Sequence, residues 1–245
     1  GMATNVPPHN LGEVLDACEA YIDNPQITGE ELLDYIPGPD FPTGGQVLGK
    51  SGVRAAYLTG NGSVVVRAKT TIEELNKNRE AIVVHEVPYQ VNKGRLLERL
   101  GEVVREKIVE GISEIRDESD KDGVRIVIEI KRDAQGDIVL NQLFKHTQLQ
   151  TSFGCNMVAL NFGRPQMLVL RDLIETFITF REEVITRRTI HELGKARERA
   201  HTLIGLAVAV ANIDDVITLI RNAPDPQTAR EELLGRTWDV GDVAP

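Results

Sequence analysis

Apolar residues recur at helical spacing near the start of the chain. In the stretch LGEVLDACEAYID they stand three and four positions apart, and Asn10 and Glu13 form a capping-box arrangement at its beginning. This pattern predicts a helix over about residues 11–23, and a second short helix is predicted around GEELLDYI. The next stretch, PGPDFPTGG, is crowded with turn-forming residues and indicates an ordered loop.

From about residue 45 to residue 170 the pattern changes between helical and strand-like periods, which predicts a mixed α and β region. The predicted strands are VVVRA after the turn TGNGS, AIVVHEVP, GISEIRDES and GVRIVIEIKRD. The predicted helices are KGRLLERLGEVVREKI, capped by Asn92, and the short GDIVLNQLFKHT. The stretch LQTSFGCNMVALNFGRPQMLVL predicts a hairpin that turns at Asn161 to Pro165.

The pattern changes again at Arg171. From there to about Arg221 the sequence has no proline, two glycines and a sustained rhythm of apolar residues three and four positions apart. A helix of roughly 50 residues would be about 75 Å long and would need a partner along its apolar stripe. Pro224 and Pro226 are expected to end it. The pattern as a whole predicts an α+β fold with a long helical arm.

The composition favours a soluble protein and excludes few functions. With 245 residues, of which 41% are hydrophobic, the chain can form one large domain or two smaller ones. Cys18 and Cys155 are far apart and fit no zinc or disulfide pattern, which favours a reducing cytoplasm. The sequence has no apolar run of about 18 residues and no signal peptide, so no membrane contact is predicted.

The net charge of −9 argues against a surface coated in nucleic-acid-binding cations. The charge is uneven, however. Residues 1–50 carry eight carboxylates and one lysine, whereas residues 164–201 carry eight Lys or Arg against six Asp or Glu. A local basic contact therefore remains compatible with the acidic total.

One stretch imitates a calcium site. Five residues of ESDKDGVRIVIE fall at positions 1, 3, 5, 6 and 12 of an EF-hand loop: Glu118, Asp120, Asp122, Gly123 and Glu129. Position 1 of such a loop should be Asp, and residues 125–131 alternate like a strand where an EF-hand needs a helix. We therefore expect a hairpin turn with solvated carboxylates.

The residues alone show no complete active site. His85 and Glu86 are adjacent in a predicted strand, so their side chains should point to opposite faces. The other histidines show no metal spacing, and neither GxGxxG nor a phosphate loop ending in GK[ST] occurs. None of the four tyrosines is flanked by a base or an arginine suited to activating a phenolate.

The opening stretch GMATNVPPHN is unusual because an apolar residue precedes two prolines. Each proline fixes its own φ, and Pro7 also moves Val6 toward extended conformations. The apolar side chain of such a stiff loop either packs into the core of the chain itself or is inserted as a wedge into a binding partner.

Several long, irregular stretches together resemble the A subunits of bacterial type IIA DNA topoisomerases. They are GMATNVPPHN, YIPGPDFPTGG, HEVPYQVNK, EGISEIRDESDKDG with RIVIEIKRD, SFGCNMVAL and RRTIHELGKARERAH. The resemblance runs across nearly the whole chain. The combination of VPYQVNK with SFGCNMVAL favours the DNA gyrase type over topoisomerase IV, which shares the layout.

The resemblance implies a domain layout. Residues 1–24 would be a connector with the first helix, residues 25–170 an α+β tower domain, residues 171–222 a coiled-coil arm, and residues 223–245 the start of a dimer gate. The family's catalytic tyrosine lies upstream in an Arg-Tyr-Thr-like context that this sequence does not contain. The chain is therefore expected to be a segment that is inactive alone, with Gly1-Met2 either native mid-protein sequence or a tag remnant.

The resemblance also implies roles and partners. Val6 stands where the family usually has an isoleucine that is inserted into the minor groove of double-stranded DNA. Pro7 would stiffen this wedge and belong to the DNA-binding residues with Val6, and Asn5 and His9 would contact phosphate or sugar. The parent would be an ATP-dependent, cytoplasmic topoisomerase that supercoils DNA. Its ATP and magnesium would be held by the B subunit of gyrase, and no cofactor or metal by this chain.

The same resemblance implies a homodimer formed through the arm and the gate. Two alternatives stay open at this point. One is a segment of the A subunit of topoisomerase IV. The other is a purely structural dimerisation module with no DNA contact of its own, which the long apolar stripe motivates.

Overall fold

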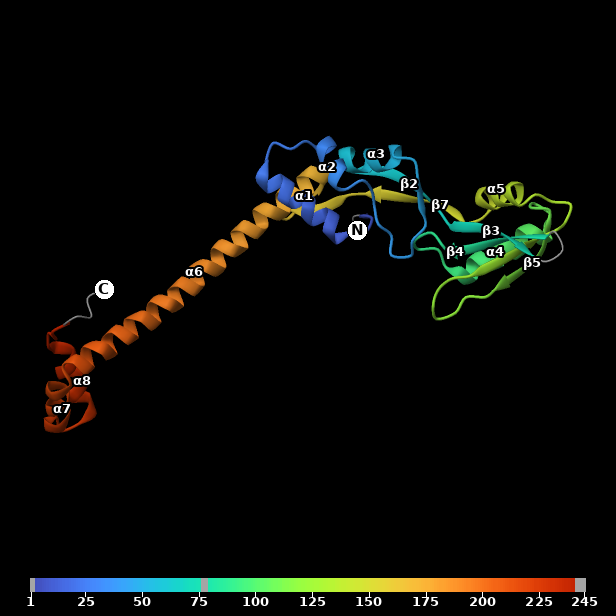
Figure 1. Cartoon of the computed structure of the whole chain (residues 1–245). Helices are drawn as coiled ribbons and strands as arrows, with labels where there is room; N and C mark the ends of the chain where they lie inside the picture. The colour runs from blue at the N-terminus through green and yellow to red at the C-terminus, as the bar shows by residue number, and fades with distance from the viewer. Residues whose placement is uncertain (1–2, 76–78, 241–245) are drawn as a thin grey trace. The chain divides into compact units, whose positions relative to one another are not determined.

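The computed structural model describes residues 3–75 and 79–240, and within it the chain divides into two compact units. The first unit comprises residues 1–178 and the second residues 179–245 (Figure 1). Helix α6, Leu170–Ala211, begins in the first unit and continues into the second.

One half of the first unit packs three helices against a small sheet. The helices are α1 (Leu11–Asp23), α2 (Gly29–Tyr35) and α3 (Ser51–Thr59). The antiparallel strands, in sheet order, are β1 (Gln46–Leu48), β2 (Asn61–Arg67) and β7 (Gln150–Asn156). Their shared core contains Leu32, Tyr57 and Phe153, together with Leu170 and Ile174 from the first turns of α6. This core fixes where α6 begins.

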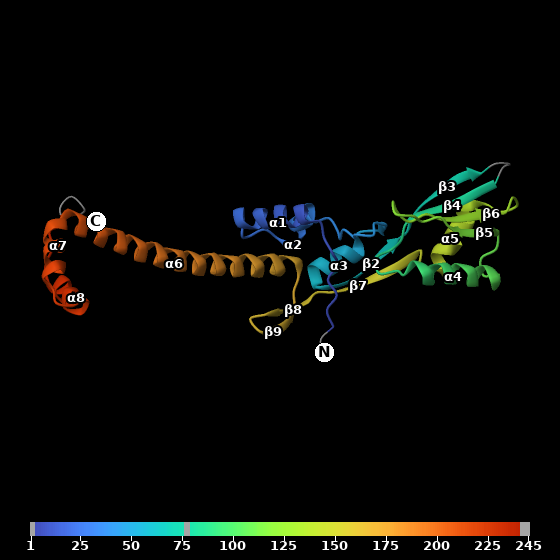
Figure 2. The same cartoon turned by 90° about the horizontal axis from the view of Figure 1, so that it is seen from below.

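The other half of the first unit is a four-stranded antiparallel sheet with two helices (Figure 2). In sheet order its strands are β3 (Lys69–Leu75), β4 (Arg79–Glu86), β6 (Ile126–Ile130) and β5 (Ile112–Asp117). The helices α4 (Lys93–Arg105) and α5 (Gly136–His146) bury Leu96, Leu100 and Leu143 against Ile82 and Ile128 of the sheet. A separate hairpin, β8 (Val158–Asn161) with β9 (Arg164–Met167), follows β7.

Most of the predicted elements are confirmed, because their signals are local. Asn10 caps α1 by accepting from the amides of Gly12 and Glu13, and Asn92 caps α4 through the amide of Arg95. The reciprocal capping box that we predicted for Asn10 and Glu13 is found instead at α2, between Thr28 and Glu31. Helix α3 was not predicted; its N-cap residue, Lys50, makes no side-chain capping hydrogen bond that would mark its start.

The stretch that resembles an EF-hand loop, residues 118–129, is confirmed to contain a hairpin turn. Asp120 and Gly123 form an antiparallel bridge between β5 and β6. The expectation of solvated carboxylates is wrong for Glu129, which lies in β6, is only 8% exposed and forms ion pairs with Arg79 and Arg116. Among the residues that the structure describes, no group of three or more His, Cys, Asp or Glu side chains is arranged to hold a metal ion.

The second unit is helical, and here the single long helix that we predicted through residue 221 is wrong. Helix α6 ends at Ala211, and α7 (Ile213–Asn222) follows at a bend of 87°. Asn212 lies at the break with φ −111°, and its side chain donates to the carbonyls of Val208 and Asp239. An asparagine amide that binds nearby carbonyls offers the backbone an alternative to the helix.

Pro226 also has a different role from the one predicted. It occupies the first turn of α8 (Pro226–Gly235), whose N-cap Asp225 accepts from the amide of Thr228. Proline is favoured at that position because its missing N–H would have no helical partner there. Within the described residues, no single helix is long and apolar enough to cross a membrane, although α6 and α7 would pass that test together if their bend were ignored.

The two halves of the first unit are joined through the carboxylate of Glu86. Its Oε2 accepts from the amide of Gly45 at 2.6 Å, and its Oε1 accepts from Nζ of Lys69 at 3.1 Å. These hydrogen bonds, led by that from Gly45, hold the pKa of Glu86 below its usual range. His85 is hydrogen-bonded instead to Thr71. The two neighbours therefore have different partners, and their pointing to opposite faces of the strand stays a prediction.

Gly44, the residue before this contact, is required for two reasons: its backbone has a positive φ, and a side chain there would clash. Gly44 has φ +71°, and a Cβ there would lie 2.1 Å from Oε2 of Glu86. Gly49 has a similar φ of +73°, but a Cβ there would meet no atom within 4 Å. A substitution at Gly49 therefore measures the conformational cost of a side chain alone. A substitution at Gly44 measures the conformational and the steric cost together.

We expect Gly49→Ala to lower the free energy of unfolding by about 1–2 kcal/mol, the cost of a left-handed alanine. Gly44→Ala should cost about 2 kcal/mol more, because the displaced carboxylate loses a charged hydrogen bond. Urea unfolding followed by circular dichroism measures both. Equal losses would show that the Glu86 contact does not constrain this turn.

Candidate nucleic-acid interface

The segment that carries Val6 is tied to strand β7 like a short extra strand. Asn5 and Asn156 exchange two backbone hydrogen bonds, each of 2.9 Å. The hydroxyl of Thr4 donates to the carbonyl of Val158 at 2.7 Å, and Nδ2 of Asn156 donates to the carbonyl of Ala3 at 2.8 Å. These contacts fix the backbone just before Val6.

The backbone just after Val6 is fixed as well. Pro7 is buried, and the carbonyl of Pro8 accepts from the amide of Asp40 at 2.9 Å. Between these anchors the side chain of Val6 is 48% exposed. One side of it borders an apolar hollow of about 180 Å³, formed with Met157, Leu170 and other residues at the foot of α6. Val6 is thus held at the surface and is not plugged into the core.

His9 is an anchor of this loop. Its Nε2 and the hydroxyl of Tyr57 share a hydrogen bond of 2.6 Å, and the two rings lie 5.5 Å apart. Burial lowers the pKa of His9, partly offset by a hydrogen bond to the Pro7 backbone, and burial raises the pKa of Tyr57. A proline backbone offers only a carbonyl, so the other ring nitrogen donates to it and Nε2 accepts from Tyr57. Both side chains are therefore neutral at pH 7.

The side chain of Asn5 is also used inside the chain, since its Nδ2 donates to the carbonyl of Gly154 at 2.6 Å. Of the four residues predicted to contact DNA, the structure thus places Val6 at the surface and Pro7 in the interior behind it. Asn5 and His9 have intramolecular partners. The prediction from sequence missed Asn156 and Tyr57, which hold the loop, because no local signal links residues so far apart in the chain.

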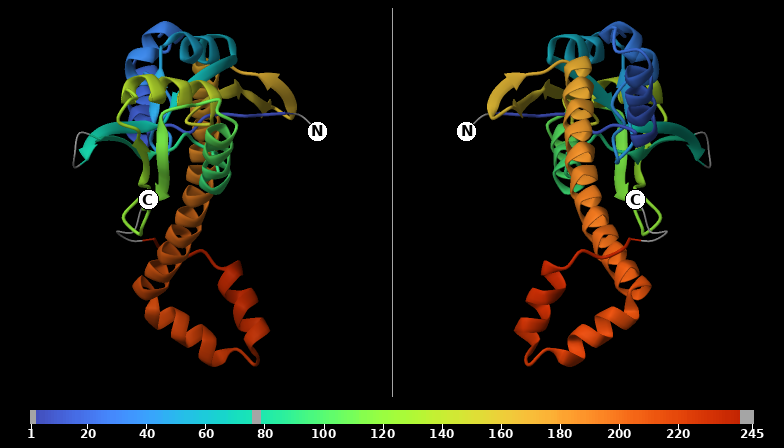
Figure 3. Two further views of the ribbon diagram at one scale, coloured as in Figure 1. Left: turned by 90° about the vertical axis from the view of Figure 1, so that its right-hand side faces the viewer. Right: turned by 90° about the vertical axis from the view of Figure 1, so that its left-hand side faces the viewer.

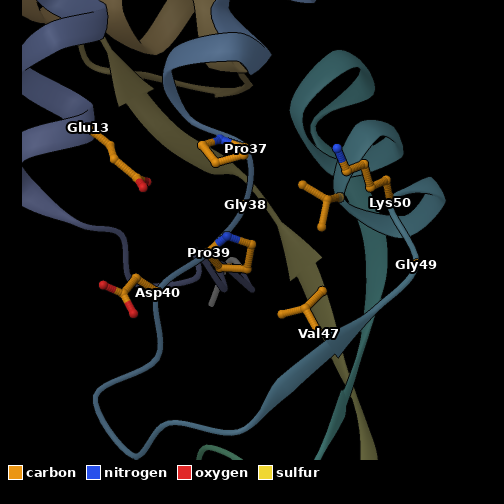
Figure 4. Close-up of a pocket in the computed structure, with 9 residues that line it drawn as sticks. Glu13, Pro37, Gly38, Pro39, Asp40, Val47, Gly49 and Lys50 are labelled. Carbon is orange, nitrogen blue, oxygen red and sulfur yellow. The ribbon is translucent and has the colours of Figure 1, made fainter.

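A larger hollow lies on another side of α1. It measures about 590 Å³, and its lining includes Pro37, Pro39, Asp40 and Lys50. Figure 4 shows the carboxylates of Glu13 and Asp40 on one side and Lys50 on the other. Two carboxylates against one ammonium group make this hollow a poor site for phosphate.

Tyr57 does not have the surroundings of a nucleophile. It has a histidine partner, but it is 1% exposed and burial raises its pKa. A phenol activated for attack needs a lowered pKa and access to the substrate. The His9–Tyr57 pair is therefore structural.

A family model for the A subunit of DNA gyrase and topoisomerase IV matches residues 1–240 of the chain. The chain belongs to this family. Its relatives include the DNA gyrase A proteins of Granulibacter bethesdensis, 61% identical, and of Salmonella typhimurium and Escherichia coli, each 58% identical. Each comparison covers all 245 residues of this chain but only 26% to 28% of the relative. The chain thus spans about a quarter of the length of these gyrase A proteins.

The His9–Tyr57 pair of this gyrase-like segment can be tested by titration. Since burial is the main cause of the lowered pKa of His9, Tyr57→Phe should leave that pKa below 6.5 while costing about 1 kcal/mol of stability. Because the folded pKa is depressed, the contribution of His9 to stability is present above pH 6.5 and is lost as the pH falls below it. NMR titration of the imidazole protons measures the pKa; a value of 6.5 or higher in the unsubstituted chain would contradict the assignment.

Proposed function

We propose that the chain is part of the DNA breakage-reunion subunit of an ATP-dependent type II topoisomerase of the gyrase kind. In this proposal, residues 25–170 form the tower domain, and α6 is the outgoing half of the coiled-coil arm. Membership of the family and the names of the relatives support it. The parent enzyme acts on double-stranded DNA in the cytoplasm, and its ATP and magnesium are held by the partner B protein of gyrase.

The proposed role in DNA bending is supported by the way the backbone is anchored on both sides of Val6. Apolar side chains inserted between base steps of the minor groove are an established way to hold a bent duplex. An inserted side chain holds the bend only if its backbone stays in place against the tendency of the bases to restack. Backbone hydrogen bonds at Asn5 and Pro8 anchor both sides of Val6, while the side chain itself remains half exposed.

Magnitudes indicate how much one valine can contribute. Burying its side chain stabilises by about 1.5–3 kcal/mol, whereas unstacking one base step costs a few kcal/mol. The two free energies are of the same order. The burial of Val6 therefore offsets the cost of unstacking and contributes little net free energy to DNA affinity. We infer that Val6 sets the shape of the bound DNA and that contacts to the phosphate backbone elsewhere supply most of the binding.

In the full-length gyrase A protein, assembled with its B partner, we expect Val6→Ala to reduce the bending of a gate duplex, because the truncated side chain no longer fills the opened step. Val6→Ile should bend the duplex at least as strongly as valine. Fluorescence energy transfer between dyes at the two ends of the duplex measures the bend.

Leu11→Ala is the matched control, since Leu11 is a neighbouring apolar residue that is 72% exposed. Bending that Val6→Ala leaves unchanged would remove the wedge role. The isolated chain serves as the negative control for chemistry. It is proposed to cleave no plasmid even with the B partner, ATP and magnesium, because the nucleophilic tyrosine lies outside it.

A second role is favoured by the surface of α6 within the second unit. Several large apolar side chains there are between 47% and 68% exposed: Phe180, Ile190, Leu193, Leu203, Leu206 and Val210. Exposed apolar surface of this extent is typical of an interaction site. We propose that this exposed apolar surface of α6 is covered by a second helix and contributes to the homodimer of the parent protein.

The isolated chain should therefore self-associate in a concentration-dependent way in sedimentation velocity experiments. Leu203→Glu with Leu206→Glu should abolish the association, because two charges replace the centre of the apolar surface. His201→Glu adds a charge next to that surface without removing an apolar contact and should have little effect. A monomer at all concentrations would contradict this role.

A further inference from the structure

Carboxylates are absent from the sequence around the Val6 loop. Acidic residues make up 37 of the chain's 245 residues, yet none occurs in residues 1–12 and none between Asp137 and Asp172. These two stretches are brought together in the fold by the Asn5–Asn156 pairing and by the bond from Thr4 to Val158. We call the surface made by residues 3–9, strand β7 and the β8–β9 hairpin the carboxylate-free strip.

At one end of the strip lies a polar hollow of about 290 Å³. Its lining contains amide and hydroxyl side chains and no charged residue: Asn5, Gln90, Gln148, Thr151 and Ser152. Gln90, Gln148 and Ser152 are exposed. Gln90 has φ +65°, which is uncommon for a residue other than glycine. These neutral groups can donate hydrogen bonds to an anionic partner without repelling it.

At the other end, the β8–β9 hairpin carries an exposed aromatic side chain. Figures 2 and 3 show the hairpin extending from the body of the first unit beside the N-terminal segment. Its two turn residues, Phe162 and Gly163, have φ of +47° and +75°, as in a type I′ turn. Phe162 is 89% exposed. A bulky residue in this conformation, facing solvent, contributes nothing to the hairpin that explains its presence.

Arg164 follows this aromatic residue by two positions in the sequence. Arg164 is exposed, and no ion pair with it is found among the described residues. Leu160 and Met167 on the same hairpin are 66% and 50% exposed. An aromatic tip, an exposed guanidinium and two adjoining stretches of chain without carboxylates match the chemistry of a nucleic-acid backbone, which repels carboxylates and attracts arginine.

We propose that the carboxylate-free strip contacts the sugar–phosphate backbone of the same duplex that Val6 bends. Arg164 binds a phosphate, and Phe162 packs against sugar or base edges in the minor groove. The amides and hydroxyls at the other end of the strip hydrogen-bond to phosphate oxygens on the opposite side of the wedge. The inference rests on the proposed function, because it assigns further contacts to the DNA proposed there.

Arg164→Ala in the full-length gyrase A protein, assembled with its B partner, tests the phosphate contact. The plot of log binding constant against log salt concentration should become shallower by about 0.9, the value of one lost phosphate contact on duplex DNA. Arg132→Ala is the matched control: Arg132 is also exposed and forms no ion pair among the described residues, but it lies in the turn after β6. It should leave the slope unchanged.

Phe162→Asn tests the aromatic tip without unfolding the hairpin. Asparagine is preferred in a type I′ turn, so the melting temperature should stay the same or rise. DNA affinity should nevertheless fall several-fold, a combination that a merely structural role for Phe162 would not produce. Unchanged affinity in Phe162→Asn together with an unchanged salt slope in Arg164→Ala would overturn the proposal.

Two further outcomes distinguish this inference from the proposed function. If Val6→Ala reduces bending while both hairpin variants behave like the unsubstituted protein, the strip proposal fails and the wedge stands. If the unsubstituted assembly itself does not bend DNA, the proposed function fails. If the hairpin variants lose assembly with the B partner at an unchanged salt slope, the hairpin is a protein interface and the strip proposal is overturned.

Discussion

The pair of backbone hydrogen bonds between Asn5 and Asn156 is the constraint on which the candidate site depends. It joins residues 151 positions apart and makes the N-terminal segment a short partner of strand β7. Because side chains alternate in direction along an extended segment, fixing Asn5 in this register also fixes which way Val6 points. The same register brings the Thr4 hydroxyl to the carbonyl of Val158. Without it, the backbone before Val6 would lose its anchor to strand β7.

The two prolines explain why so few contacts can hold this loop. Ordering a residue costs about 1–2 kcal/mol of backbone entropy, whereas a hydrogen bond contributes a net of about 0.5–1.5 kcal/mol. Ordering five ordinary residues would therefore cost about as much free energy as the anchoring hydrogen bonds of the segment return. Pro7 and Pro8 are already restricted in the unfolded chain, so fixing them costs less. The balance moves toward a preformed loop, which is what a wedge against a stiff duplex requires.

Sequence reasoning succeeded where the physics is local and failed where it is not. The caps at Asn10 and Asn92 and the turn at Gly123 could be predicted because the interacting groups lie within a few residues of each other. The pairing of β2 with β7 could not, and neither could the contact of His9 with Tyr57, since their partners are far away in the chain. The position of Val6 was found through a family resemblance; its exposure and its anchors needed the structure.

The break between α6 and α7 at Asn212 shows a second limit of prediction from sequence. The apolar rhythm that predicted one helix through residue 221 does continue beyond Ala211, and α7 is itself amphipathic. Periodicity reports which face of a helix is apolar but not whether two segments share an axis. The deciding interactions are the bonds from the Asn212 side chain to Val208 and Asp239, and the second of these requires a chain that has already folded back.

The acidic composition and a DNA-binding surface are compatible because electrostatic interactions in salt are short-ranged. At about 0.1 M salt, exposed charges separated by more than roughly 10 Å are largely screened from each other. What a phosphate meets is therefore set by the groups within that distance. The stretch between Asp137 and Asp172 contributes no carboxylate there, whereas Asp40 lies against Pro8 at the other side of the loop. The net charge of −9 acts at longer range, where it slows non-specific association with nucleic acid. Under the proposed function, such a chain would hold DNA weakly at random sites and would retain a bent duplex through the anchored side chain of Val6.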